Sequence, residues 1–104
     1  MEEIKSVQQF NDLIQKPRVI VMFTANWCPD CFVIKPFLPQ IVAQYTEFEF
    51  YSVNRDELME LCEAYDIFGI PSFVAFGEGN ELGRFVSKDR KTRQEIENFI
   101  QSVK

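Results

Sequence analysis

Hydrophobic residues follow helical spacing in some stretches of the chain and strand-like spacing in others. Runs with apolar residues three and four positions apart predict amphipathic helices, and short β-branched or aromatic runs predict strands. The expected helices cover about residues 6–15, 33–45, 56–65 and 92–103, and the expected strands cover about residues 19–23, 48–53, 72–76 and 81–86. The predicted order is therefore α-β-α-β-α-β-β-α.

Polar residues mark where the predicted helices begin. Ser6 with Gln9, and Thr92 with Glu95, have the spacing of a capping box, in which two side chains satisfy free backbone N–H groups. Asp56 precedes the third apolar stripe and is expected to cap that helix.

Prolines and glycines mark places where the predicted helices and strands bend or end. Pro36 lies inside the second expected helix and should kink it, because proline lacks the N–H that the helix needs. The glycine-containing segment 77–80 separates the last two strands and predicts a hairpin.

The order of elements predicts how the chain packs. Strands separated by helices should return parallel through right-handed crossovers, and the last two should pair antiparallel. We therefore expect an α/β protein with three layers, α/β/α, around a central mixed sheet. Its length of 104 residues predicts a single domain over residues 1–104.

Charge and composition narrow the function classes. The formal net charge of −5 disfavours binding to nucleic acid or to anionic membranes, so we expect neither as a partner. The N-terminus lacks the basic start and apolar run of a secretory signal, which predicts a cytoplasmic protein. Three cysteines are too few for a secreted disulfide scaffold.

Two of the cysteines form a Cys-x-x-Cys pair where a buried strand ends and a long helix begins. Cys28 takes the N-cap position, and Pro29 suits the first helical position, where no backbone N–H is needed. The N–H near Cys31 should then point at the Cys28 sulfur. Such donors, together with the helix dipole, favour a thiolate.

The spacing assigns different roles to the two cysteines. Cys31 lies one turn inside the helix, so Cys28 is expected to attack a substrate disulfide and Cys31 to resolve the mixed disulfide. Asp30 stabilises the first turn of the helix, but its charge should disfavour a thiolate at Cys28.

Metal binding is the alternative interpretation of the cysteine pair. A structural zinc ion needs four ligands, and this chain has no histidine. The third cysteine, Cys62, lies on an apolar helix stripe and is expected to be a packing residue. We therefore predict no metal in a single chain, although a metal or iron–sulfur centre shared between two chains stays possible.

Three features together resemble the thioredoxin family. They are the WCPDC motif at 27–31, Pro36 five residues after the second cysteine, and Ile70-Pro71 ahead of a strand. The resemblance covers the whole chain and implies the thioredoxin fold. It implies a cis Ile70–Pro71 peptide lying against the cysteines, and a substrate groove lined by Trp27, Ile70 and Pro71.

The resemblance also implies an enzyme, a protein-disulfide reductase that needs no bound cofactor. Its partners would be disulfide-bearing proteins, with thioredoxin reductase or a low-molecular-weight thiol as electron donor, and we expect a monomer. Two alternatives stay open: a redox-inactive binding module with the same fold, and a selective reductase of small-thiol adducts on proteins.

The chain departs from the family pattern at several positions. Pro29 and Asp30 stand where Gly-Pro is usual. Met22 occupies the place of a buried Asp that assists proton transfer to and from the resolving cysteine, and Ser52 and Ser87 replace the usual Lys and Gly. Because a thioether cannot move a proton, slower or more selective reduction is expected.

Overall fold

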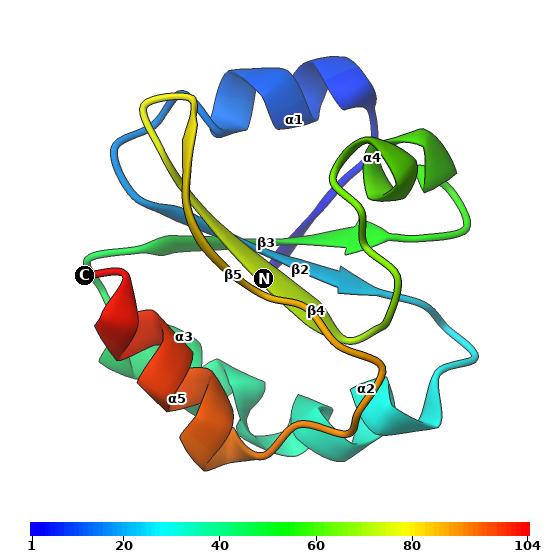
Figure 1. The fold of residues 1–104 in the computed structure, drawn as a ribbon. Helices are drawn as coiled ribbons and strands as arrows, with labels where there is room; N and C mark the ends of the chain where they lie inside the picture. Colours follow the sequence, from blue (N-terminus) through cyan, green and yellow to red (C-terminus); the bar gives the residue numbers. More distant parts are fainter.

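One five-stranded mixed sheet forms the centre of the molecule (Figure 1). A computed structural model describes all residues, 1–104. The strands are β1 (Glu2–Ile4), β2 (Val19–Thr24), β3 (Glu49–Asn54), β4 (Ser72–Gly77) and β5 (Asn80–Phe85), in the spatial order β1-β3-β2-β4-β5. The central strand β2 pairs parallel with β3 and antiparallel with β4.

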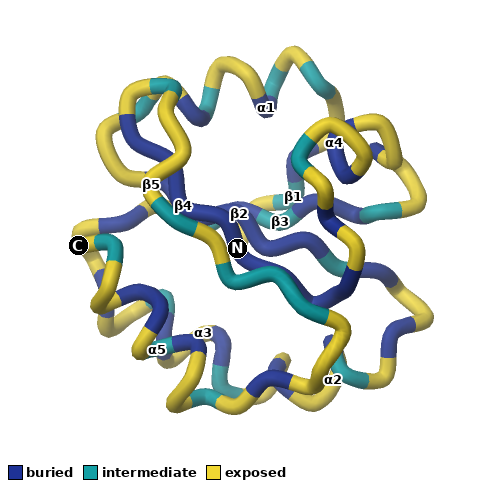
Figure 2. Tube along the Cα trace, in the orientation of Figure 1, coloured by how far each residue is buried: buried dark blue, intermediate teal, exposed yellow.

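Helices cover both faces of this sheet. They are α1 (Val7–Leu13), α2 (Pro29–Ile34), the 3₁₀ turn η1 (Lys35–Phe37), α3 (Leu38–Gln44), α4 (Met59–Ala64) and α5 (Arg93–Ser102). Helices α1 and α4 lie on one face and α2, α3 and α5 on the other, with the central strands buried between them (Figures 1 and 2). The three-layer α/β/α architecture predicted from the sequence is therefore confirmed.

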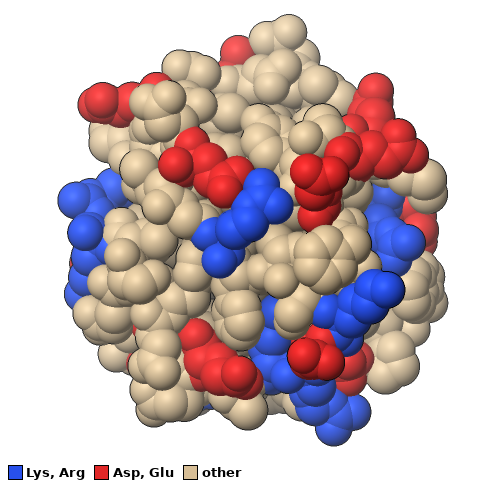
Figure 3. Space-filling model, viewed as in Figure 1, with Lys and Arg blue, Asp and Glu red and all other residues tan.

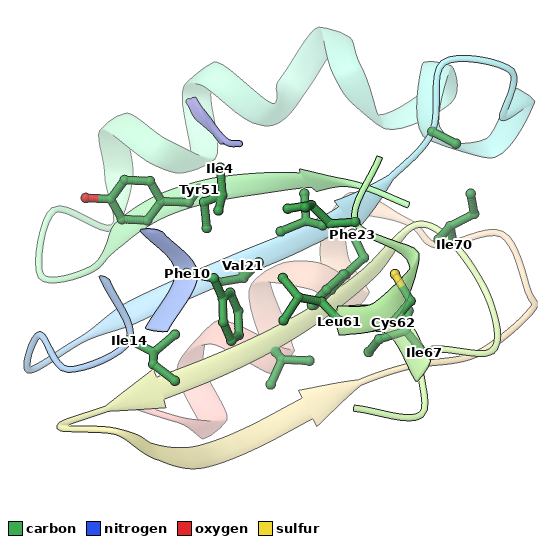
Figure 4. Packing of buried hydrophobic residues seen from close by; sticks show 14 of the residues in the cluster. Ile4, Phe10, Ile14, Val21, Phe23, Tyr51, Leu61, Cys62, Ile67 and Ile70 are labelled. Atoms are coloured by element: carbon green, nitrogen blue, oxygen red, sulfur yellow. The ribbon is translucent and has the colours of Figure 1, made fainter. Parts of the chain in front are cut away.

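Each face of the sheet has its own apolar core. Phe10 of α1 and Leu61 of α4 pack with Val21 of β2 on one side (Figure 4). Ile41 of α3 and Ile96 of α5 belong to the cluster on the other side. Burial on both faces explains why the sequences of β2 and β4 are apolar almost throughout, whereas a strand with one exposed face alternates apolar and polar residues.

The predicted caps are present at both ends of the chain. The Ser6 hydroxyl accepts a hydrogen bond from the Gln9 N–H at 3.0 Å, but the Gln9 side chain accepts from the Lys5 N–H instead of the Ser6 N–H, so the capping box expected here is only half formed. Thr92 and Glu95 form the complete capping box. The expected cap by Asp56 is wrong, because α4 begins after Leu58 and has no side-chain cap. The Asp56 carboxylate is engaged elsewhere, at the site described below.

Pro36 interrupts the second predicted helix as expected. The single long helix becomes α2, the 3₁₀ turn η1 and α3, with Pro36 inside the 3₁₀ turn. A proline removes one backbone donor and its ring crowds the preceding turn, so the helix tightens locally instead of continuing.

A short N-terminal strand was not predicted. Residues 2–4 form β1, which pairs parallel with the edge of β3, Ile4 opposite Val53. Only Ile4 is buried among its residues. Three residues with one apolar position carry no periodic signal, so this strand exists only because β3 offers a free edge.

The expectation that helix-separated strands return parallel fails at β4. The segment 55–71, which contains α4, leaves the chain at the end of the sheet where β2 ends. Strand β4 therefore starts beside the end of β2 and runs antiparallel to it. This places the Ile70-Pro71 segment beside the cysteine motif.

The predicted hairpin joins β4 to β5 through the two residues Glu78 and Gly79. Both have positive φ, 53° and 87°, as the favoured two-residue hairpin turns require.

Among the helices of the structure, none is long and apolar enough to span a lipid bilayer.

Candidate active site

The cysteine motif begins α2 at the carboxyl end of the central strand. Cys28 is the N-cap of α2, and its Sγ accepts a hydrogen bond from the Cys31 N–H at 3.2 Å. Pro29 is the first helical residue. The local geometry predicted from the sequence is therefore confirmed, and a helix N-terminus points at the Cys28 sulfur, where it favours negative charge.

The two cysteines have different surroundings although both residues are 3% exposed. Burial, and then the hydrogen bond to Cys28, raise the pKa of Cys31 to about 11, while the Thr24 side chain acts in the opposite direction. Cys31 is therefore a protonated thiol near neutral pH. Cys28 alone lies at the helix N-terminus and accepts the Cys31 N–H, so the two sulfurs have different surroundings.

The Ile70–Pro71 segment lies against Cys28. The Ile70–Pro71 peptide is cis, as the resemblance implied, and the Cys28 thiol donates to the Ile70 carbonyl at 3.8 Å. The segment is packed from behind, because a Cβ on Gly69 would lie 2.1 Å from the carbonyl oxygen of Ser87. Only glycine fits there, which fixes how closely the chain after β5 approaches the site.

Trp27 lies at the surface next to the motif. Its side chain is 58% exposed, and its indole N–H donates to the Asp56 carboxylate at 2.8 Å. The Arg55 guanidinium lies 5.7 Å from the ring centre. Trp27 is therefore not a core residue, and the loop after β3 holds it beside the cysteines. This engagement also explains why Asp56 does not cap α4.

Asp30 has a partner that the sequence did not reveal. The Arg90 guanidinium donates to its carboxylate at 2.9 Å. Figure 3 shows positive and negative side chains next to one another over α2 and the segment that leads to α5. The ion pair offsets the charge of Asp30, so its effect on a thiolate at Cys28 is smaller than the isolated carboxylate would give. Sixty positions separate the two residues, so no local pattern links them.

Lys91 lies in the charged run 88–93, yet it is only 2% exposed. Its ammonium donates to the carbonyl oxygens of Ser87 and Asp89 and to the Ser87 hydroxyl, and it lies 5.2 Å from the ring centre of Phe85. Burial lowers the pKa of Lys91. A long side chain in a charged run can fold inward, and sequence reasoning misses this.

Replacing Lys91 with methionine is expected to raise the stability of the fold by about 1 kcal/mol at pH 7, because a buried charge often costs more than an apolar group of similar size. This corresponds to an increase in Tm of about 4–8 °C. The lowered pKa means that the unfolded chain binds more protons, so wild type gains stability as the pH rises towards 10.5.

The difference in the free energy of unfolding between Lys91→Met and wild type should therefore become smaller as the pH rises towards 10.5. Urea unfolding at pH 7 and pH 10 measures it, with Lys88→Met, at an exposed neighbour, as the control. A destabilised Lys91→Met at pH 7 would show that the three hydrogen bonds outweigh the cost of burying the ammonium.

Met22 stands behind the motif, in the middle of β2. It is 7% exposed and is paired with Ser52 on β3 and with Phe73 on β4. The residues at the two positions that the resemblance assigned to a buried Asp and its Lys companion are thus neighbours in the sheet. Neither a thioether nor a hydroxyl takes up a proton near neutral pH, so this part of the site holds no acid–base group.

Cys62 is a buried residue of α4 and packs in the apolar cluster between that helix and the sheet. Figure 4 shows its sulfur close to Leu61 and Ile67. Burial raises its pKa, which makes it a poor nucleophile at neutral pH.

Comparisons with known proteins show which family has this fold and this cysteine motif. The family model for thioredoxin matches residues 2–102. Thioredoxin H-type from Fagopyrum esculentum is 34% identical over 86 aligned positions, and the match covers 78% of this chain and 74% of that protein. Thioredoxin from Chlamydia pneumoniae is 33% identical over 92 residues, 88% of this chain and 90% of that protein.

Solved structures show the same fold over the full length. Plasmodium falciparum thioredoxin superimposes with a TM-score of 0.88 at 26% identity, covering 100% of both chains. Fasciola hepatica thioredoxin gives a TM-score of 0.86 at 24% identity, again over 100% of both chains. The chain belongs to the thioredoxin family and has the thioredoxin fold. It is a thiol–disulfide oxidoreductase that acts on disulfide substrates.

Proposed function

We propose that this protein reduces disulfide bonds in other proteins, with Cys28 as the attacking residue and Cys31 as the resolving residue. The observation that carries the proposal is the hydrogen bond from the Cys31 N–H to Cys28 Sγ at 3.2 Å. This contact stabilises negative charge on Cys28 only, while burial keeps Cys31 protonated. The thiolate is the nucleophile in disulfide exchange, so the attack starts at Cys28.

The reaction balances in two exchanges. The Cys28 thiolate attacks one sulfur of the substrate disulfide, which forms a mixed disulfide and releases the other substrate sulfur as a thiolate. Cys31 then loses its proton to solvent and attacks Cys28 Sγ, which releases the second substrate thiolate. Two electrons pass to the substrate, and the protein is left with a Cys28–Cys31 disulfide.

The surface around Cys28 supports a protein substrate. Trp27 and Phe68 are large apolar side chains with 58% and 61% exposure, and Phe68 lies two residues before Ile70. Trp27 is the chain neighbour of Cys28, and the Ile70 carbonyl oxygen lies 3.8 Å from Cys28 Sγ. Exposed apolar side chains near a reactive group are typical of a docking surface for another chain. Phe68 was not singled out from the sequence, because one aromatic residue in a loop carries no pattern.

The electron donor is proposed to be a thioredoxin reductase, with a low-molecular-weight thiol as the other donor. We further propose a cytoplasmic monomer without a bound cofactor. The acidic surface supports partners other than nucleic acid or anionic membranes. A second function, the selective removal of small-thiol adducts from proteins, is favoured by one observation, that Met22 replaces the acid that would speed resolution.

The test is reduction of insulin disulfides, followed by NADPH consumption in the presence of thioredoxin reductase. Steady turnover is the expected result. If insulin is not reduced while cysteinylated proteins lose their adducts, the protein is an adduct reductase. If neither substrate is reduced although the Cys28–Cys31 dithiol oxidises and reduces reversibly, the proposed activity is wrong.

A further inference from the structure

Lys91 carries a buried positive charge that no carboxylate balances. The residue is 2% exposed, and no aspartate or glutamate oxygen lies within 4.0 Å of its ammonium. Its three N–H donors are bound by uncharged oxygens instead, the Ser87 carbonyl at 3.2 Å, the Ser87 hydroxyl at 3.1 Å and the Asp89 carbonyl at 3.0 Å. A buried charge without a counter-ion lowers stability, and natural proteins keep such costly groups mainly where function needs them.

The three bonds hold a loop that has little other support. Residues 86–91 join β5 to α5 (Figure 1), and their N–H and C=O groups make no hydrogen bond to any other backbone group. Apart from the bonds of Lys91, the loop makes one hydrogen bond, from Arg90 to the Asp30 carboxylate. The Lys91 ammonium connects the two ends of the loop, because Lys91 is its last residue and Ser87 lies near its first. We therefore expect the conformation of this loop to depend on Lys91.

The loop lies against the segment that contacts Cys28. A Cβ on Gly69 would lie 2.1 Å from the Ser87 carbonyl oxygen, and this same oxygen accepts a hydrogen bond from Lys91. Gly69 directly precedes Ile70, whose carbonyl oxygen lies 3.8 Å from Cys28 Sγ. A continuous path of contacts therefore leads from the buried ammonium to the attacking sulfur.

We propose that Lys91 is a positioning residue of the substrate groove. Its ammonium holds the loop 86–91 in one conformation against Gly69, and the loop in turn fixes the backbone that a substrate chain meets at Ile70 and Pro71. The proposal rests on the proposed function, because it concerns how a protein disulfide is presented to Cys28. Lys91 takes no part in the exchange of the sulfurs.

An ordered loop should matter more for a protein substrate than for a small disulfide. A protein chain fits the groove over several residues, so a loop that is already ordered loses no conformational freedom when the substrate binds. Without the ammonium, the loop would become ordered only on binding, and that ordering would weaken the binding of the substrate. A disulfide of a few atoms gains little from the groove, so its reaction depends mainly on the Cys28 sulfur.

Single-turnover reduction of insulin tests the proposal without an electron donor. Reduced protein is mixed with excess insulin over a range of concentrations, and quenching with N-ethylmaleimide gives the fraction of oxidised protein. Lys91→Met should raise the half-saturating insulin concentration about fivefold, with little change in the maximal rate. The ratio of the rate with insulin to the rate with 2-hydroxyethyl disulfide should fall by the same factor. A fall in both rates by one factor would contradict the proposal.

Two further variants separate positioning from charge and from folding. Lys91→Gln lacks the charge but keeps N–H donors for the loop carbonyls, so it should restore part of the affinity that Lys91→Met loses. Lys88→Met removes a positive charge from an exposed position of the same loop and should bind insulin like wild type. An equal loss of affinity in Lys88→Met and Lys91→Met would show that charge alone attracts insulin, and it would overturn the proposal.

Backbone order parameters from nitrogen-15 NMR relaxation measure the loop itself. Residues 86–91 should have values of about 0.85 in wild type and values below about 0.6 in Lys91→Met. Because Lys91→Met is expected to be more stable than wild type, such a loss of order would be local and would not reflect a damaged fold. A loop that stays rigid in Lys91→Met would contradict the proposal even if insulin bound more weakly.

These outcomes are separable from the proposed function. If wild type reduces insulin and Lys91→Met has an unchanged half-saturating concentration, only the role of Lys91 is wrong. If wild type leaves insulin oxidised, the proposed function is wrong, and the order parameters still decide whether Lys91 holds the loop.

Discussion

Replacing Cys28 with serine is expected to lower the rate of insulin reduction by on the order of 10⁴-fold, to the uncatalysed background. Serine keeps the N-cap of α2, since its hydroxyl can accept the same bond from the Cys31 N–H. The fold should therefore be unchanged, and only the nucleophile is lost. The measurement is NADPH-coupled turnover, with circular dichroism to confirm that the variant is folded.

Cys31→Ser separates the two roles within the pair. This variant should still attack through Cys28 but should stop at the mixed disulfide, which mass spectrometry of the protein with a bound substrate chain detects. Cys62→Ala is the matched control, because it removes a buried cysteine that lies in the apolar cluster and should leave turnover unchanged. A mixed disulfide on Cys31 in the Cys28→Ser variant would reverse the assigned order of attack.

The second large effect is expected when the missing acid is restored. Met22→Asp should speed resolution of the mixed disulfide about 10²-fold at pH 7, because a positioned carboxylate can accept the Cys31 proton. Rapid-quench measurement of substrate release from a preformed mixed disulfide gives this rate. Met59→Asp, at a residue that is 50% exposed, adds the same charge as a control. A folded Met22→Asp protein with an unchanged or slower rate would contradict this account.

The pH dependence of wild type tests the same step without a substitution. Only the thiolate form of Cys31 attacks, and its pKa is raised to about 11. The resolution rate should therefore rise about tenfold for each unit between pH 7 and pH 10, since the thiolate fraction rises by that factor below the pKa. A rate that levels off near pH 7 would show that another group already removes the proton.

Local signals in the sequence predicted the parts of the site that lie close together in the chain. Cys28, Pro29 and Cys31 could be placed because an N-cap, a first-turn proline and a two-residue spacer obey rules of the helix terminus alone. The kink at Pro36 and the turn at Glu78 and Gly79 followed from backbone chemistry in the same way.

The fold class was predictable because a strand that is covered on both faces is apolar at successive positions of its sequence. The apolar runs of β2 and β4 indicated a sheet covered on both sides, and that requires helices in two layers. The direction of β4 was not predictable from periodicity, because periodicity does not tell at which end of the sheet the segment after β3 leaves the chain.

Contacts between distant residues were decided only by the tertiary structure. Arg90 pairs with Asp30, and Lys91 turns inward, because the chain after β5 runs past α2 and approaches the backbone at Gly69 closely. A hollow beside Cys31 is likewise lined by residues of β1, β2, β3, α2, η1 and α3. The sequence by itself determined the reactive motif and the layers, through rules that act within a few residues. The charges and openings around the two sulfurs depend on which segments meet in space, and only the packed chain decides that.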